Sequence, residues 1–343
     1  MEESHYETDM VIIGAGPVGI FASFQAGLLG IKCHLLDNLD RPGGQCTQLY
    51  PEKPIYDIPA RPSVTGQKLI DDLLEQAGPF DPQFHFNQQA QSLLRLDDGR
   101  WQVSTSHGVV VRAAAVVIAA GAGSFVPKRP AIKNIEDFED KSVFYEVHRM
   151  ADFKDKNVVI VGGGDSALDW VLSLTPIAKR VMLVHRRPDF RAAPDSVDKM
   201  FDLLNAGKID FTVGTVQEIQ GQDGIIDQLQ IQTAEGDNIT HTCDVLMPFF
   251  GLKVSLGPIA EWGLNLERNH IHVDAATHET GIEGLYSIGD ICTYPGKIKL
   301  ILTGFHEAAT MAHTAFSYIF PNEKKASGYS STSSELQSRL GVK

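Results

Sequence analysis

The chain has 343 residues, of which 43% are hydrophobic and 21% are charged, and its formal net charge is -13. This length and composition predict about two domains with substantial cores and exclude a disordered chain. The acidic balance argues against general nucleic-acid binding, which needs a basic surface, but it leaves room for one local basic site.

The N-terminus, MEESHYETDM, has no basic segment followed by an apolar core, so we expect no signal peptide. No apolar run approaches the ~18 residues of a membrane helix, so we expect no membrane partner. The four cysteines, Cys33, Cys46, Cys243 and Cys292, form no CxxC pair. Their scatter predicts a reducing, cytoplasmic location without disulfides or a metal site.

The first glycine-rich segment, GAGPVG, has the spacing GxGxxG. An apolar run at 11–13 precedes it, a helical pattern follows, and a second apolar run at 33–36 ends at Asp37. This order predicts a strand, turn, helix and strand that hold a pyrophosphate at the helix N-terminus and a ribose on the carboxylate. The residues expected to bind this dinucleotide are Gly14, Gly16, Pro17, Gly19 and Asp37.

The pattern recurs in VGGGDSALD, with strands expected at 158–161 and 181–184 and a helix from about Ser166. Ala167 replaces the third glycine, which this type of turn tolerates. The two units lie too far apart for a solenoid repeat. They predict two separate dinucleotide-binding domains.

The second unit differs from the first where its second strand ends. The position matching Asp37 is His185, and three arginines follow it. Arginines bind a 2′-phosphate by paired, charge-assisted hydrogen bonds, so NADPH is expected rather than NADH; the alternative is a solvated basic turn. The residues expected to bind NADPH are Gly163, Gly164, Asp165, Ser166, His185, Arg186, Arg187 and Arg191.

An acid in one unit and arginines in the other suggest FAD and NADPH as the cofactors. With VVIAAGAG, HRRPDFR and GLYSIGDI in order, almost the whole chain resembles the two-dinucleotide-domain flavoproteins related to thioredoxin reductase. The resemblance implies an α/β fold of two Rossmann-like, three-layer ββα domains, with the NADPH domain inserted into the FAD domain. The implied FAD domain is residues 1–120 and 254–343, and the NADPH domain is 121–253.

Thioredoxin reductase has a redox-active CxxC just ahead of its second glycine motif, whereas this stretch, VFYEVHRMADFKDKNVVIVGGG, has no cysteine. The chain therefore resembles the ferredoxin–NADP⁺ reductases of this type. They pass a hydride from NADPH to flavin N5 and then two single electrons to ferredoxin or flavodoxin. The alternatives are an NADPH diaphorase, a disulfide oxidoreductase lacking its own CxxC, and a non-catalytic nucleotide-binding module.

The resemblance also implies residues around the flavin ring. Gln45 would bond FAD, and Tyr50 would stack on one face of the isoalloxazine. In a homodimer, Tyr329 of the partner would cover the other face, with Ser331 near the ring. Composition alone predicts a flexible Ser-rich tail at 326–334, whereas the resemblance implies an ordered one.

Further positions are carried over by motif. Ala90 would meet the adenine through its backbone, Phe125 would line the flavin pocket, and Asp290 would bond the ribitol or pyrophosphate. A helix opening near Gly304 would direct its positive end at the flavin. No protein acid or base is expected, and His306 is either a proton donor or a solvent-facing side chain.

Ferredoxins are usually acidic, so docking to this acidic chain needs a local positive face. The candidates are Lys128, Arg129, Lys133, Lys297 and Lys299, with an ordinary solvated surface as the alternative.

Overall fold

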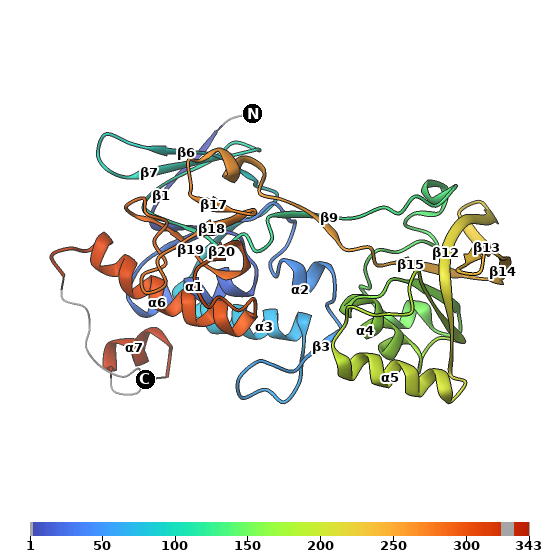
Figure 1. Cartoon of the computed structure of the whole chain (residues 1–343). Coiled ribbons are helices and arrows are strands. Elements are labelled where there is room, and N and C mark those ends of the chain that lie inside the picture. The colour runs from blue at the N-terminus through green and yellow to red at the C-terminus, as the bar shows by residue number, and fades with distance from the viewer. Residues whose placement is uncertain (1–2, 324–332, 343) are drawn as a thin grey trace. The chain divides into compact units, whose positions relative to one another are not determined.

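The structure, a computed structural model, describes residues 3–323 and 333–342 (Figure 1). The chain divides into two compact units, one of Met1–Ser124 with Val254–Lys343 and one of Phe125–Lys253. The sequence placed these divisions after residues 120 and 253. Both crossings are short strands, β9 (Ser124–Pro127) and β16 (Leu252–Ser255), which pair with each other.

The first unit is built on a seven-stranded sheet whose central strand, β1, pairs in parallel with β2 on one side and β8 on the other. β7 and β6 continue the sheet from β8 as an antiparallel hairpin, and β19 also pairs with β8 in parallel. The strands are β1 (Ser4–Ile13), β2 (Cys33–Leu36), β5 (Gln83–His85), β6 (Ala90–Arg95), β7 (Trp101–Thr105), β8 (Val109–Ile118) and β19 (Leu285–Ser287).

Alternation along β1 produces three layers. Met10 and Ile12 pack with α1 (Pro17–Leu28) and α6 (Ile301–Ile319), which lie side by side in Figure 1. Val11 and Ile13 of β1 pack on the opposite face of the sheet, against a small three-stranded sheet. That sheet consists of β17 (Leu266–Glu267), β18 (His270–His272) and β20 (Cys292–Thr293).

Strand β1 is longer than the sequence predicts, since the apolar run indicated only residues 11–13. The polar residues from Ser4 onward also pair with β8, in a register that places Ser4 opposite Val109. Their side chains are mostly exposed, so the backbone hydrogen bonds of the ladder, rather than apolar burial, extend the strand. Strand β2, by contrast, occupies the predicted residues.

Shorter elements complete the unit. Helix α3 (Gly66–Ala77) is capped by Thr65, whose hydroxyl accepts from the backbone N–H of Lys68 at 3.3 Å. The others are α2 (Gln45–Gln48), β3 (Pro54–Ile55), β4 (Val64–Thr65), the 3₁₀ helices η1 (Gly78–Phe80), η4 (Gly257–Glu261) and η5 (Gly289–Ile291), and α7 (Ser334–Arg339).

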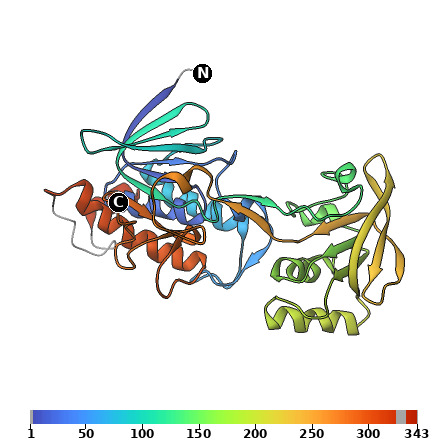
Figure 2. The same ribbon diagram turned by 45° about the horizontal axis from the view of Figure 1, so that its top comes forward.

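The second unit has a six-stranded sheet in the order β14–β13–β12–β11–β10–β15, parallel from β12 to β15 and antiparallel from β12 to β14. Helices α4 and α5 pack beside each other, as both views show (Figure 2). The elements are η2 (Ile135–Phe138), η3 (Met150–Phe153), β10 (Asn157–Val161), α4 (Asp165–Leu174), β11 (Arg180–His185), α5 (Pro194–Asn205), β12 (Ile209–Gln222), β13 (Ile225–Thr233), β14 (Asn238–Thr242) and β15 (Val245–Pro248).

The predicted strands and helix of this unit are confirmed, and each predicted boundary differs from the observed one by at most one residue. Strand β10 begins one residue before the expected 158–161, and helix α4 begins at Asp165 rather than Ser166. Among the described residues, no helix is both long enough and apolar enough to cross a membrane.

We expect the core of the first unit to be sensitive to truncation at β2. Leu35 is 0% exposed, so Leu35→Ala leaves a cavity and lowers the free energy of unfolding. The expected loss is about 2–5 kcal/mol. Leu94→Ala is the matched control: Leu94 is 55% exposed on β6, and its loss should stay within about 0.5 kcal/mol. Urea unfolding followed by tryptophan fluorescence measures both, and equal losses would contradict the description of the core.

Candidate functional site

The first glycine turn brings the end of β1, the start of α1 and the end of β8 together. Gly14 has φ +109°, and a Cβ there would lie 2.4 Å from the Ala119 carbonyl oxygen. A Cβ on Gly19 would lie 2.0 Å from the Gly14 carbonyl oxygen. Glycine is therefore required at both positions by close backbone packing, before any ligand is considered.

Gly16 is different, because its backbone conformation and its described neighbours do not require a glycine there. Its φ of -72° suits any residue, and no described atom lies within 4 Å of a Cβ built on it. Gly16 is also the N-cap of α1, with Pro17 in the first turn, and no described side chain caps this end. Open space in front of free helix amides suits a pyrophosphate, so the residues present fit FAD.

Asp37 lies at the end of β2, where its carboxylate is held by the backbone. Oδ2 accepts from the Ala15 N–H at 2.6 Å, and Oδ1 accepts from the Leu39 N–H at 2.9 Å. Burial raises the pKa of Asp37, and the backbone hydrogen bonds oppose that rise. The carboxylate is thus fixed next to the glycine turn, with lone pairs left for ribose hydroxyls.

The segment before Ala90 lies against Asp37. The Asp37 N–H donates to the His85 carbonyl at 3.0 Å, and the Gln88 N–H donates to the Asp37 carbonyl at 2.7 Å. β6 then begins at Ala90, which is buried. The structure therefore brings the segment just before Ala90 against Asp37. The contact of Ala90 with the adenine stays a prediction.

The loop RPGGQC folds over the first glycine turn. The Gly43 N–H donates to the Ala15 carbonyl at 2.8 Å, and a Cβ on Gly44 would lie 3.3 Å from the Gly16 Cα. Helix α2 starts at the next residue, Gln45. One turn further on, the Tyr50 hydroxyl lies 3.7 Å from the Cys46 sulfur. Burial raises the pKa of Tyr50, so its phenol stays neutral.

Val18 of α1 joins the glycine turn to the C-terminal motif. A Cβ on Gly304 would lie 2.3 Å from Val18 Cγ2, and one on Gly289 would lie 3.5 Å from Val18 Cγ1. Asp290 follows Gly289 and is exposed. Its charge helps to raise the pKa of Tyr50 and of Cys46. Helix α6 begins at 301, three residues before the predicted 304, and no described side chain caps it.

Three predicted flavin residues cannot be placed in this way. Phe125 belongs to β9, and its side chain lies outside the described part of the structure. Tyr329 and Ser331 lie outside the described residues. Their roles stay predictions.

The second glycine turn repeats the arrangement of the first. A Cβ on Gly163 would lie 2.3 Å from the His185 ring, so glycine is required where strand and turn meet. Gly164, the N-cap of α4, has φ -106°, and a Cβ there would meet no described atom within 4 Å. Gly164 therefore corresponds to Gly16: it leaves space at a helix N-terminus that no described side chain caps.

The loop after β11 folds back onto this turn. The Arg191 N–H donates to the Gly163 carbonyl at 2.7 Å, and the Ala193 N–H donates to Asp165 Oδ1 at 2.8 Å. Ser166 is exposed in the first turn of α4. The predicted NADPH residues on both sides of the loop are thus brought together.

Three arginines follow the second strand of this unit. Arg186, Arg187 and Arg191 are exposed, and within 3–323 and 333–342 none of them forms an ion pair. The His185 ring stacks on Phe190 with centroids 5.4 Å apart. Burial lowers the pKa of His185, and the two neighbouring arginines lower it further, so the ring is neutral and the arginines supply the charge.

The predicted basic docking face is wrong at Lys297, whose side chain is only 5% exposed and is paired with the buried Glu307. Lys133 is engaged with Glu218 at 2.7 Å, and Arg129 is paired with Glu139 and Glu136. Lys128 and Lys299 are exposed. Burial thus excludes Lys297 from a docking face, and neighbouring carboxylates pair with Lys133 and Arg129.

All four cysteines are free and buried. Burial raises the pKa of Cys46 to about 11 and that of both Cys243 and Cys292 to about 12. The pKa of Cys33 is raised as well. Since the thiolate is the nucleophile in disulfide exchange, these thiols are poorly suited to it at neutral pH. In the described ranges, no cluster of three or more His, Cys, Asp or Glu side chains could hold a metal ion.

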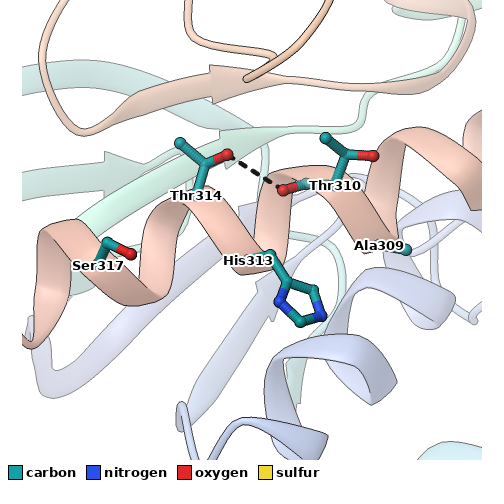
Figure 3. Close-up of a pocket in the computed structure, with 5 residues that line it drawn as sticks. All are labelled: Ala309, Thr310, His313, Thr314 and Ser317. Atoms are coloured by element: carbon teal, nitrogen blue, oxygen red, sulfur yellow. Dashed lines mark hydrogen bonds between the residues drawn. The ribbon is translucent and has the colours of Figure 1, made fainter. Parts of the chain in front are cut away.

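A separate pocket of about 580 Å³ lies along α6, lined by Ala309, Thr310, His313, Thr314 and Ser317 (Figure 3). The Thr314 hydroxyl donates to the Thr310 carbonyl at 3.2 Å, and the Thr310 hydroxyl donates to the His306 carbonyl. Both hydroxyls are committed to the helix, and none of the predicted site residues lines this pocket. We assign it no redox role.

Sequence reasoning missed Glu307, which is 0% exposed on α6. Its signal was available, because it interrupts an apolar helical face that includes Ala308 and Ala312. A charged residue inside such a face marks a buried pair or a functional group.

The fold and the two sites define a class of protein. The family model described as pyridine nucleotide-disulphide oxidoreductase matches residues 8–314, and the chain belongs to this family. The ferredoxin–NADP reductase of Parvibaculum lavamentivorans is 54% identical over 342 residues, 100% of both chains. That of Mesorhizobium japonicum is 54% identical over 335 residues, 98% of both.

Solved structures agree with this family at the level of the fold. Lactococcus lactis thioredoxin reductase matches with a TM-score of 0.76 and 23% identity, covering 92% of this chain and 99% of that one. T. acidophilum thioredoxin reductase matches with a TM-score of 0.76 and 21% sequence identity. The match covers 91% of this chain and 98% of that one. The predicted two-domain α/β fold is confirmed.

The open space at Gly16 gives a test of the first site. Gly16→Ala should raise the FAD dissociation constant at least about tenfold, because the added methyl group enters space left for the pyrophosphate. Since the φ is already suitable, the fold should lose no more than about 1 kcal/mol, the cost of alanine at an N-cap. Released flavin fluorescence on serial dilution of the holoenzyme measures the affinity.

Gly78→Ala is the matched control, because a Cβ there also meets no described atom within 4 Å and φ is -49°. It should leave FAD affinity unchanged. Unchanged affinity in Gly16→Ala as well would contradict the placement of the pyrophosphate.

Proposed function

We propose that this chain is a ferredoxin–NADP⁺ reductase that uses FAD and NADPH. The observation that carries the proposal is the 54% identity, over the full length of both chains, to a protein named ferredoxin–NADP reductase. The geometry supports it independently, because each unit presents an open, uncapped helix N-terminus within the described residues.

The residues of the first unit bind and orient FAD in this proposal. The amides following Gly16 hold the pyrophosphate, and Asp37 holds the ribose. Asp290 would hold the ribitol or pyrophosphate. Bound FAD supplies the redox chemistry, since flavin accepts a hydride and releases single electrons.

The start of α6 gives the flavin site its electrostatics. No described side chain caps this helix, and its first turn contains no acidic residue. Its positive end is therefore free to stabilise negative charge on the ring. His306 is exposed in the second turn of this helix, which favours the solvent-facing alternative over a proton donor.

NADPH is selected over NADH by charge in the second unit. Arg186, Arg187 and Arg191 surround the end of the second strand, where a 2′-phosphate would lie. Because these arginines form no ion pair among the described residues, no carboxylate has to be displaced when a phosphate binds.

The disulfide oxidoreductase alternative is disfavoured by the buried, protonated thiols. The diaphorase alternative differs only in the electron acceptor, which makes ferredoxin dependence the deciding property. Flavodoxin as a second acceptor and a homodimer in which the partner's tail covers the flavin stay predictions. Four free cysteines support a reducing, cytoplasmic location as part of the proposal.

The proposal predicts cytochrome c reduction that depends on both NADPH and ferredoxin. We expect a strong rate with both present and a slow rate when ferredoxin is omitted or NADH replaces NADPH. Flavin reduction by NADPH without any ferredoxin dependence would favour the diaphorase. Absence of flavin reduction would favour a nucleotide-binding module.

The arginines give a test of cofactor selection. Arg186→Ala/Arg187→Ala should raise the KM for NADPH by about a hundredfold or more, since charged hydrogen bonds contribute about 1.5–3 kcal/mol each and two are lost. The KM for NADH should not change, because NADH has no 2′-phosphate. Lys208→Ala removes an exposed cation of the same unit and is the control. Equal effects on NADPH and NADH would contradict the assignment.

A further inference from the structure

A buried ion pair lies directly behind the Gly289–Asp290 turn. Lys297, from the loop before α6, contacts Glu307 in the second turn of that helix. Their side chains are 5% and 0% exposed. Both are therefore removed from water, which is uncommon for a lysine and a glutamate.

Stability alone does not explain this pair. Transferring two charges from water costs several kcal/mol each, and replacing such a pair by apolar residues is often neutral or stabilising. A role beyond stability has to come from what the two charged groups contact.

Both members of the pair bond the same residue. The Gly289 N–H donates to Glu307 Oε2 at 2.7 Å, and Lys297 Nζ donates to the Gly289 carbonyl at 3.0 Å. Gly289 has φ +78°, a conformation that favours glycine. The pair thus holds a left-handed turn by both its backbone groups, one residue before Asp290.

The remaining contacts fix the pair itself. The Tyr294 hydroxyl donates to Glu307 Oε1 at 2.6 Å, and Lys297 Nζ lies 5.5 Å from the centroid of the Tyr294 ring. The Cys292 thiol lies 3.6 Å from Glu307 Oε2. Each carboxylate oxygen therefore has two partners, which restricts rotation of the carboxylate.

We propose that Lys297 and Glu307 are positioning residues that set the orientation of Asp290 in the FAD site. The inference rests on the proposed FAD function. Asp290 is exposed and Gly289 packs on Val18 of α1, so rotation of the Gly289 peptide moves the carboxylate relative to the pyrophosphate turn. The ion pair thereby contributes to FAD binding without touching the cofactor.

A double-mutant cycle on the holoenzyme tests this. Lys297→Met/Glu307→Gln removes both charges at similar volume and leaves the Gly289 carbonyl without its donor. Asp290→Ala removes the group being positioned. FAD release on serial dilution, read by flavin fluorescence, gives the dissociation constant for each protein and for the triple variant.

We expect the pair variant to raise the FAD dissociation constant about tenfold, as for one charge-assisted hydrogen bond. In the Asp290→Ala background the same change should have no further effect. Lys32→Met is the control: it removes the charge of an exposed lysine in the same unit and should leave FAD affinity unchanged. Glu307→Asp is a second variant, because it keeps the charge pair but shortens the reach to the Gly289 N–H.

Additive losses in the cycle, or no loss in either pair variant, would overturn the inference while leaving the FAD site intact. An Asp290→Ala variant with normal FAD affinity would instead overturn the assignment of Asp290 in the proposed function, and the inference with it. Coupling between Glu307→Asp and Asp290→Ala supports the inference even if the double-charge variant fails to fold.

Discussion

The organisation of both units depends on one property of the α-helix, that its first amides have no partner within the helix. In helix α3 the Thr65 hydroxyl accepts from one of these amides, that of Lys68. Helices α1 and α4 do not, because glycines 16 and 164 cap them without a side chain and leave open space in front. A bound anion would meet the requirement, which is why the proposed function places the two pyrophosphates at these helix ends.

In each unit, the sheet places a polar or charged side chain beside the N-terminus of the helix that follows the glycine turn. Parallel strands place their carboxyl ends at one edge of the sheet, so the residue after the second strand lies beside the glycine turn in both units. In the first unit that residue is Asp37, fixed by two backbone N–H groups. In the second it is His185, followed by arginines that form no ion pair within the described part of the chain. The two units therefore share one backbone arrangement, and in the proposed function a few side chains select a different nucleotide in each.

Much of this was predictable from the sequence, because it is encoded locally. Glycine spacing, apolar runs and helical periodicity act over a few residues, and they placed β2 at its observed bounds and α4 to within one residue. They failed where the determining contact is distant. The polar start of β1 is a strand only because β8 pairs with it, and α6 begins before Gly304, at 301.

Lys297 shows the limit most clearly. Its sequence context, a Gly-Lys in a polar loop, predicted an exposed cation for docking, whereas the fold buries it against Glu307 and the Gly289 peptide. The sequence by itself determined the two strand–glycine turn–helix units and the charge that distinguishes them, because hydrogen-bonding turns and periodic burial are local. Only the tertiary structure decided which charges reach solvent and which hold the backbone, because that depends on groups brought together from separate segments.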